Sequence, residues 1–162
     1  MGRANRRASA EEIDKMRALV ECGMRDGAFG LSSGLEYVPG AYAPLEEIVD
    51  LIIKVRAGAY SIEAANVRHE HEWRVWETVK LPEGKCLIPG VITHHTTTVE
   101  HPRLVADRIV RFARLVGREN VIAGSDCGFA QTESIERVHL TVMWAKFESL
   151  VAGAQLASKE LW

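Results

Sequence analysis

Apolar residues follow two alternating patterns along this chain, one with helical spacing and one made of short continuous runs. Helical spacing predicts four helices, at residues 9–26, 44–55, 102–116 and 139–161. Short apolar runs predict four strands, at residues 27–33, 58–65, 86–92 and 121–123. Alternating strands and helices are typical of parallel strands joined by right-handed crossovers. The pattern therefore predicts an α/β fold.

Local signals refine the predicted elements. Ser9 and Glu12 form a capping box at the first helix, and Pro102 suits the first position of the third. Pro89 interrupts the third strand and fits a strand end or bulge better than a central position. Residues 131–137 read as a polar loop. The predicted buried faces of the last two helices are Leu104, Val105, Ile109, Phe112 and Val116, and Met143, Trp144, Phe147, Leu150, Val151 and Ala154.

The length limits the architecture. The chain has 162 residues, whereas a complete eight-stranded β/α barrel needs roughly 250. Four strands are half of such a barrel and leave two unpaired edges, which a second copy related by a two-fold axis would cover. We therefore predict one domain over residues 1–162, about half of a TIM (β/α)8 barrel with four parallel strands, completed by a homodimer. The alternative is a doubly wound four-stranded sheet in a monomer.

Charge and composition exclude several classes of partner. A net charge of −2 gives no basic field for nucleic acid or a membrane surface. The chain has no apolar stretch of roughly 18 residues and no signal-peptide core after the first Met. Residues 1–8 read as a disordered tail. Three cysteines without a C-x-x-C spacing indicate a reducing, cytoplasmic setting.

Candidate chemistry gathers where the predicted strands end. In the segment Asn120 to Phe129, NVIAGSDCGF, an apolar run that is expected to be buried is followed by a small-residue loop that carries Cys127. A cysteine at a strand end is a candidate metal ligand or nucleophile, and the alternative is a buried structural thiol. Glu63 lies near the end of an apolar strand, where an unpaired carboxylate is costly to bury. His94 and His95 lie in the polar loop THHTTT after the third strand. His69 and His71 are further candidate metal ligands, and the alternative is that they contact solvent or form salt bridges.

Several longer motifs carry a resemblance. They are SIEAAN at residue 61, RHEHEW at 68, LIPGVI at 87, VEHP at 99, VGRENVIAGSDCGF at 116 and WAKFESLVAGAQLASKELW at 144. With these motifs, residues from about Tyr60 to Trp162 resemble the C-terminal part of the cobalamin-independent methionine synthase family, in its shorter bacterial form. The resemblance implies a methyltransferase in which zinc activates a substrate thiol.

The same resemblance implies roles for particular residues. Glu63 and Cys127 match two of the family's zinc ligands. His95 is the better match to a proposed proton donor and His94 the second; the family usually has Asp where Thr93 stands. A neutral imidazole is also able to bind zinc directly. The family's His-x-Cys ligand pair should precede Tyr60 and is absent there, which predicts that this chain alone does not complete methyl transfer.

The first part of the chain carries a different resemblance. Its motif is EEIDKMRALVECGMRDGAFGLSSGLEYVPGAYAP at residue 11, followed by LEEIVDLIIKV. Residues from about Ser9 to Val55 thereby resemble the N-acyl-D-amino-acid deacylases of the amidohydrolase superfamily. The two resemblances predict a chimera joined near Arg56 to Tyr60, with a deacylase-like segment at residues 9–57 and a methionine-synthase-like segment at residues 58–162.

Three hypotheses for function follow. The first is a zinc-dependent thiol methyl or alkyl transferase fragment with a small-molecule thiol substrate. The second is an amidohydrolase fragment of the deacylase type, for which no catalytic residue can be carried over. The third is a non-catalytic recombinant half barrel. The sequence leaves open whether the chain is an enzyme.

Overall fold

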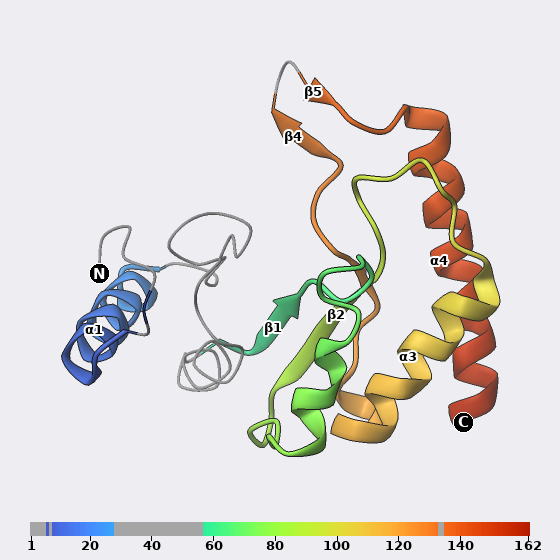
Figure 1. Cartoon of the computed structure of the whole chain (residues 1–162). Helices are drawn as coiled ribbons and strands as arrows, with labels where there is room; N and C mark the ends of the chain where they lie inside the picture. The colour runs from blue at the N-terminus through green and yellow to red at the C-terminus, as the bar shows by residue number, and fades with distance from the viewer. Residues whose placement is uncertain (1–5, 7, 28–56, 133–134) are drawn as a thin grey trace. The chain divides into compact units, whose positions relative to one another are not determined.

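The computed structural model describes residues 6, 8–27, 57–132 and 135–162 (Figure 1). Contacts divide the chain into two compact units, Met1–Gly58 and Ala59–Trp162. The first predicted strand beyond Gly27 and the helix predicted at residues 44–55 lie outside the described residues. No helix in the described ranges has the length and apolar character needed to cross a membrane.

The described part of the first unit is dominated by helix α1, Ala10–Arg25. The predicted capping box is present: Ser9 Oγ accepts the backbone N–H of Glu12 at 3.3 Å, and the Glu12 carboxylate accepts that of Ser9 at 2.9 Å. Within the described part of this unit, no residue of α1 is buried. Local interactions at the helix ends therefore contribute a large share of its stability.

Replacing Ser9 by alanine is expected to destabilise α1 by about 1 kcal/mol, because the Glu12 amide loses its acceptor. Amide hydrogen exchange over residues 10–25 measures the effect, which should be largest in the first turn. Ser9→Thr keeps the hydroxyl and is the matched control. Equal exchange rates in the alanine and threonine variants would show that the cap does not stabilise the helix.

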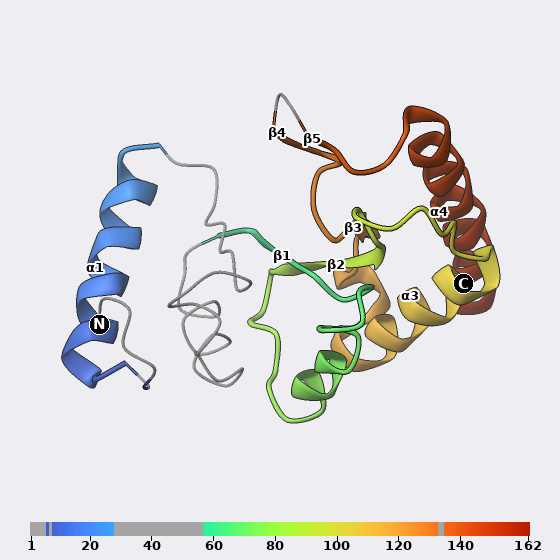
Figure 2. The ribbon, with the colours of Figure 1, turned by 45° about the horizontal axis from the view of Figure 1, so that its top comes forward.

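The second unit contains a parallel three-stranded sheet in the order β1-β2-β3. Its strands are β1 at Ala59–Ile62, β2 at Cys86–Ile92 and β3 at Gly124–Ser125. Tyr60 pairs with Leu87 and Gly90 with Gly124. Helices α3, Pro102–Val116, and α4, Leu140–Leu161, pack against β2 and against each other (Figure 2). The α/β class and parallel pairing are confirmed for these three strands.

One hydrophobic core joins β2 to the two helices. Its buried members are Val91, Ile92, Val105, Ala106, Ile109, Val110 and Ala157. Short 3-10 helices η2, Glu72–Glu77, and η3, Arg118–Asn120, lie in the connections before β2 and β3. The core fixes β2 from one side, so the segments that follow its C-terminal end start from a rigid position.

Pro89 lies in the central strand rather than at a strand end. It pairs with Ile62, the last residue of β1, and the register toward β3 shifts between Gly90 and Ile92. Pairing with β1 therefore ends opposite Pro89, and the irregular pairing with β3 at Gly90 and Ile92 follows it. A proline without an N–H is tolerated there, because few ladder hydrogen bonds are required of it.

The strand predicted at residues 121–123 is displaced. Val121 forms an isolated parallel bridge with Leu87, and the strand itself is Gly124–Ser125. The prediction that this run is fully buried is wrong, because Ile122 is 52% exposed. Among the described strands, β3 lies at the edge of the sheet and has a neighbour on one side only. A similar correction applies to residues 131–137, most of which belong to an antiparallel pair of strands, β4 at Ala130–Thr132 and β5 at Ile135–Glu136.

The inward face of helix α4 matches the predicted one only in part. Phe147, Leu150 and Ala154 pack on the core, but Trp144 and Val151 are 62% and 54% exposed. The buried residues are Lys146, Ser149, Gly153 and Ala157. A Cβ on Gly153 would lie 2.5 Å from the Cβ of Val105, so glycine allows close contact with α3. On α3, Leu104 is likewise 40% exposed.

Candidate metal centre

Three candidate ligands follow the C-terminal ends of the three parallel strands. Glu63 comes directly after β1, His94 two residues after β2, and Cys127 two residues after β3. In a parallel sheet the C-terminal ends of all strands lie at the same edge, and the loops at that edge commonly bind ligands in α/β proteins. Residues up to 64 positions apart in the sequence thereby come together.

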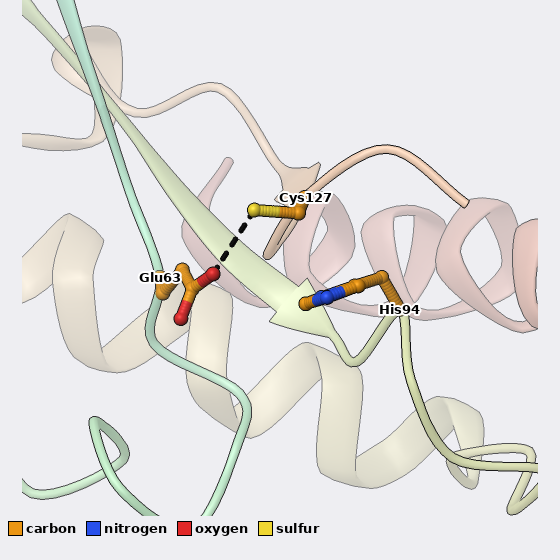
Figure 3. A group of neighbouring side chains, drawn as sticks. All are labelled: Glu63, His94 and Cys127. Atoms are coloured by element: carbon orange, nitrogen blue, oxygen red, sulfur yellow. Dashed lines mark hydrogen bonds between the residues drawn. The ribbon is translucent and has the colours of Figure 1, made fainter. Parts of the chain in front are cut away.

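The three side chains point toward a common centre (Figure 3). One ligand atom from each of Glu63, His94 and Cys127 lies within 4.8 Å of the others. The Cys127 thiol donates a hydrogen bond to Glu63 Oε1 at 3.0 Å. His94 is buried, Glu63 is partly buried and Cys127 is exposed, so Cys127 is not a buried structural thiol. The cluster is therefore accessible to solvent on the side of Cys127.

His94 has the properties of a metal-binding imidazole. It is only 6% exposed, and its Nδ1 has no hydrogen-bond partner among the described residues. Burial and the neighbouring His95 lower the pKa of His94, although Glu63 and Asp126 act in the opposite direction. The ring is therefore neutral at pH 7, which is the form that binds metals. His95 is exposed, and the centroid of its ring lies 4.9 Å from that of His94.

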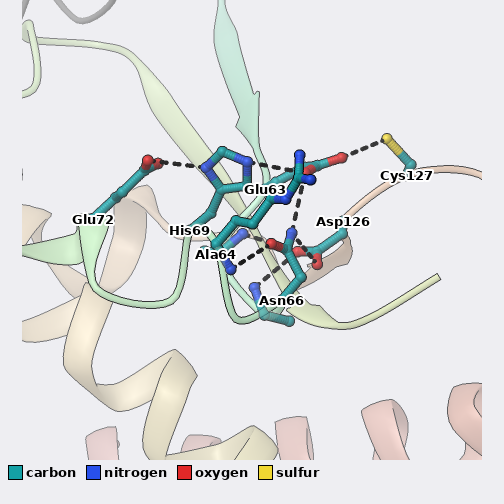
Figure 4. A network of polar contacts seen from close by, with 9 residues as sticks. Glu63, Ala64, Asn66, His69, Glu72, Asp126 and Cys127 are labelled. Atoms are coloured by element: carbon teal, nitrogen blue, oxygen red, sulfur yellow. Dashed lines mark hydrogen bonds and ion pairs between the residues drawn. The ribbon is translucent and has the colours of Figure 1, made fainter. Parts of the chain in front are cut away.

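A buried carboxylate connects the ends of β1 and β3. Asp126, which is 5% exposed, accepts hydrogen bonds from the backbone N–H groups of Ala64 and Ala65, both at 2.8 Å (Figure 4). The Asn66 side-chain amide donates to both Asp126 Oδ2 and Glu63 Oε2 at 3.0 Å. Asp126 thus fixes the backbone on which Glu63 stands, next to the loop that carries Cys127.

His69 supports Glu63 from the other side. Its Nε2 lies 3.5 Å from Glu63 Oε2, and its Nδ1 lies 2.9 Å from Glu72 Oε1. His69 is therefore a neighbour of a candidate ligand rather than a member of the three-residue cluster. Carboxylates that bind metals are commonly held by such outer hydrogen bonds. The supporting roles of Asn66 and Asp126 were not predicted, because their sequence signal is limited to their position beside Glu63 and Cys127.

Arg108 fixes the sheet edge from below. This α3 residue is 6% exposed, and its guanidinium donates to the carbonyl oxygens of Val91 at 3.0 Å and Ala65 at 3.2 Å. It also pairs with Glu70 at 3.0 Å. One side chain therefore joins the ends of β1 and β2 to the helix beneath them.

A parallel α/β sheet with carboxylate, imidazole and thiol groups at its C-terminal edge defines the chain as an α/β protein with a candidate metal site. The family model for the catalytic domain of cobalamin-independent synthases matches residues 40–147, a range that includes Glu63, His94 and Cys127. The match spans more than half of the chain, which therefore belongs to the cobalamin-independent synthase family.

A solved structure shares the fold. The B12-independent methionine synthase from Shewanella sp. W3-18-1, in complex with selenomethionine, superposes with a TM-score of 0.67 at 22% identity. The alignment covers 92% of this chain and 46% of that protein. At this identity the likeness establishes the fold, as a part of the larger methionine synthase structure.

Two curated relatives are deacylases, the second family that the sequence resembles. D-aminoacylase from Alcaligenes xylosoxydans xylosoxydans is 40% identical over 94 residues, covering 56% of this chain and 19% of the relative. N-acyl-D-aspartate deacylase from the same organism is 39% identical over 70 residues, covering 43% and 14%. The chain thus spans a fifth or less of these relatives. Both matches are longer than Ser9–Val55, and the 94-residue match necessarily overlaps residues 40–147.

Proposed function

We propose that this chain binds zinc through Glu63, His94 and Cys127 and uses it to activate a small-molecule thiol. Carboxylate, imidazole and thiolate are all zinc ligands, and three protein ligands with one open position are typical of catalytic zinc. The buried His94 Nδ1 without a described hydrogen-bond partner, inside a cluster that spans 4.8 Å, is the observation that carries the proposal. A purely structural role for His94 explains this arrangement less well, because a buried polar atom without a partner costs free energy.

Each residue has a defined task in this proposal. The Cys127 thiol donates to Glu63 Oε1, so the two side chains already lie together, and the thiol proton would be released to solvent as thiolate and carboxylate both bind the metal. His94 presents a neutral imidazole, and Asp126 and Asn66 hold the Glu63 segment in position. Bound zinc would lower the pKa of a coordinated substrate thiol and supply the thiolate for methyl or alkyl transfer. Because Cys127 must stay reduced to bind zinc, we propose a reducing, cytoplasmic location for the chain.

Metal content tests this proposal directly. The wild-type chain, purified without added zinc, is expected to carry about one zinc per chain by plasma emission and by native mass spectrometry. Cys127→Ala should lose most of it, because one of three protein ligands is removed. Cys86→Ala is the matched control, since Cys86 lies at the opposite end of β2 from the cluster. Equal, negligible zinc in wild type and Cys127→Ala would contradict the proposal.

A second candidate function is supported by the 40% identity to D-aminoacylase. In this alternative the chain is part of an amidohydrolase that removes the acyl group from an N-acyl-D-amino acid. Acetate release from N-acetyl-D-amino acids would support it, and its absence with zinc present would favour the thiol-activating site. The third hypothesis, a non-catalytic recombinant of barrel pieces, predicts neither metal nor turnover.

We further propose that the chain forms about half of a β/α barrel and completes it as a homodimer. The exposed apolar residues of α4, which include Leu140, Trp144 and Val151, support association with another apolar surface. Light scattering should give twice the chain mass. A monomer at micromolar concentration would exclude the paired barrel.

A further inference from the structure

A buried ion pair lies beneath the loop that carries His94. Lys146 of α4 has no exposed surface, and Glu100 at the end of the loop is 7% exposed. The Lys146 ammonium lies 2.8 Å from Glu100 Oε2. Lys146 stands on the inward face of a helix whose other buried residues are small. A charged side chain at such a position requires a specific explanation, because lysine is almost never fully buried unless paired.

The ion pair belongs to a network that holds both ends of the loop. Glu100 Oε1 accepts the backbone N–H of Thr93 at 2.7 Å. Lys146 donates to Thr93 Oγ1 at 3.3 Å and to the carbonyl oxygen of Thr98. Ser149 donates from the next turn of α4 to the carbonyl oxygen of Glu100. We refer to Thr93, Thr98, Glu100, Lys146 and Ser149 as the Lys146 network.

The network fixes the residue directly before His94. Thr93 is held through its backbone N–H by Glu100 and through its hydroxyl by Lys146. The preceding residue, Ile92, accepts the backbone N–H of Asp126 at 3.0 Å. The backbone on the N-terminal side of His94 is thus fixed by α4 and by the loop that carries Cys127. The imidazole therefore projects from a backbone position that is held on one side.

Stability alone is a poor explanation for this arrangement. A buried ion pair often contributes little net stability, because desolvation of the two charges offsets their attraction. Burial opposes ionisation of Glu100, yet the hydrogen bonds from Lys146 and from the Thr93 N–H lower its pKa, so the pair is charged. Apolar residues of similar volume would fill the same space without this cost.

We propose that Lys146 and Glu100 are positioning residues that hold the Thr93–Glu100 loop so that His94 meets Glu63 and Cys127. The inference deepens the proposed zinc site and rests on it for its functional meaning. The positional part concerns the loop itself and is measurable without metal.

The test removes both charges together, since removing one would leave the other buried and unpaired. The double variant Lys146→Met/Glu100→Leu is compared with Arg114→Met/Glu160→Leu, which removes an exposed ion pair between α3 and α4 at 3.0 Å. Cobalt(II) is titrated as a spectroscopic substitute for zinc. Amide hydrogen exchange at Thr93 and the His94 ring resonances are recorded in the metal-free proteins.

In the Lys146/Glu100 variant, cobalt affinity should fall by about 10- to 100-fold, the usual effect of losing residues that support a ligand. The thiolate-to-cobalt charge-transfer band should persist while the d–d bands change, because Cys127 remains and His94 is misplaced. Thr93 exchange should accelerate, and the control variant should match wild type. Wild-type cobalt affinity together with unchanged Thr93 exchange in the double variant would overturn the inference.

Two further outcomes remain decisive. If wild type binds no cobalt, the proposed zinc site fails, and Thr93 exchange with the His94 resonances still decides whether the network positions the loop. If the double variant does not fold, Ser149→Ala replaces it, since that change removes a single hydrogen bond to the Glu100 carbonyl. Unchanged Thr93 exchange and unchanged His94 resonances in Ser149→Ala would then overturn the inference.

Discussion

Replacing His94 by alanine is expected to weaken zinc binding by at least about 100-fold, because even residues that only support a ligand are worth roughly 10- to 100-fold. The same replacement at His95 is expected to change the affinity by less than about threefold, because the His95 ring is exposed and lies outside the cluster. Two adjacent histidines thus provide a matched pair within one loop.

The contrast between the two histidines follows from their surroundings. His94 is 6% exposed and brings one ring nitrogen within 4.8 Å of both Glu63 and Cys127. His95 contacts the edge of the His94 ring and also lowers its pKa. His95→Ala should therefore raise the pKa of His94 slightly, which would weaken zinc binding only at acidic pH, where protons compete for the imidazole.

Zinc affinity is measured by competition with a chromophoric chelator at pH 7.5, with circular dichroism to confirm that both variants are folded. A larger loss in His95→Ala than in His94→Ala would show that the loop adopts another conformation when metal binds. Equal small losses would show that neither imidazole is a ligand. Glu63 and Cys127 would then require a different third donor.

The choice between His94 and His95 illustrates what sequence can and cannot supply. Strand ends were predictable, because the apolar runs that precede Glu63 and the THHTTT loop are unambiguous, and β2 has the predicted bounds, Cys86–Ile92. The conformation of the THHTTT loop was not predictable, because it depends on Lys146, which lies more than 40 residues further along the chain. Resemblance favoured His95 as a proton donor, a role that stays a prediction, and the structure brings His94 to Glu63 and Cys127.

The buried face of helix α4 was also difficult to predict from the sequence. Its existence and bounds follow from helical spacing, but only part of its inward face follows from hydrophobicity. Close packing of Gly153 on Val105 and the hydrogen bonds of Lys146 turn a small and polar face toward the core. Trp144 and Val151 remain exposed as a result. Side-chain hydrophobicity alone carries no information about either constraint.

Replacing Gly90 by alanine is expected to destabilise the second unit by about 1–3 kcal/mol through overpacking. A Cβ at this position would lie 2.2 Å from Asp126 Oδ1, 2.6 Å from Asp126 Cα and 2.7 Å from its backbone N. Two of these atoms belong to the main chain, so no change of rotamer relieves the contact. The main chain around Asp126 must move, or β2 must.

That displacement would reach the candidate metal centre. Asp126 accepts the N–H groups of Ala64 and Ala65 and donates its own N–H to Ile92, so it connects all three strand ends. Moving it changes the positions of Glu63 and Cys127 together. Gly90→Ala should therefore lower zinc affinity as well as stability, whereas an ordinary core defect far from the sheet edge would lower stability alone.

Gly128→Ala provides the matched control, because its added Cβ meets no atom of the described structure within 4 Å. Thermal unfolding should show a loss of about 4–8 °C for each kcal/mol in Gly90→Ala, the usual scale for a unit of about 100 residues. Gly128→Ala should remain within about 0.5 kcal/mol of wild type. Equal melting temperatures for the two variants would mean that β2 and Asp126 are less closely packed than described, and the link between strand ends and metal ligands would fail with them.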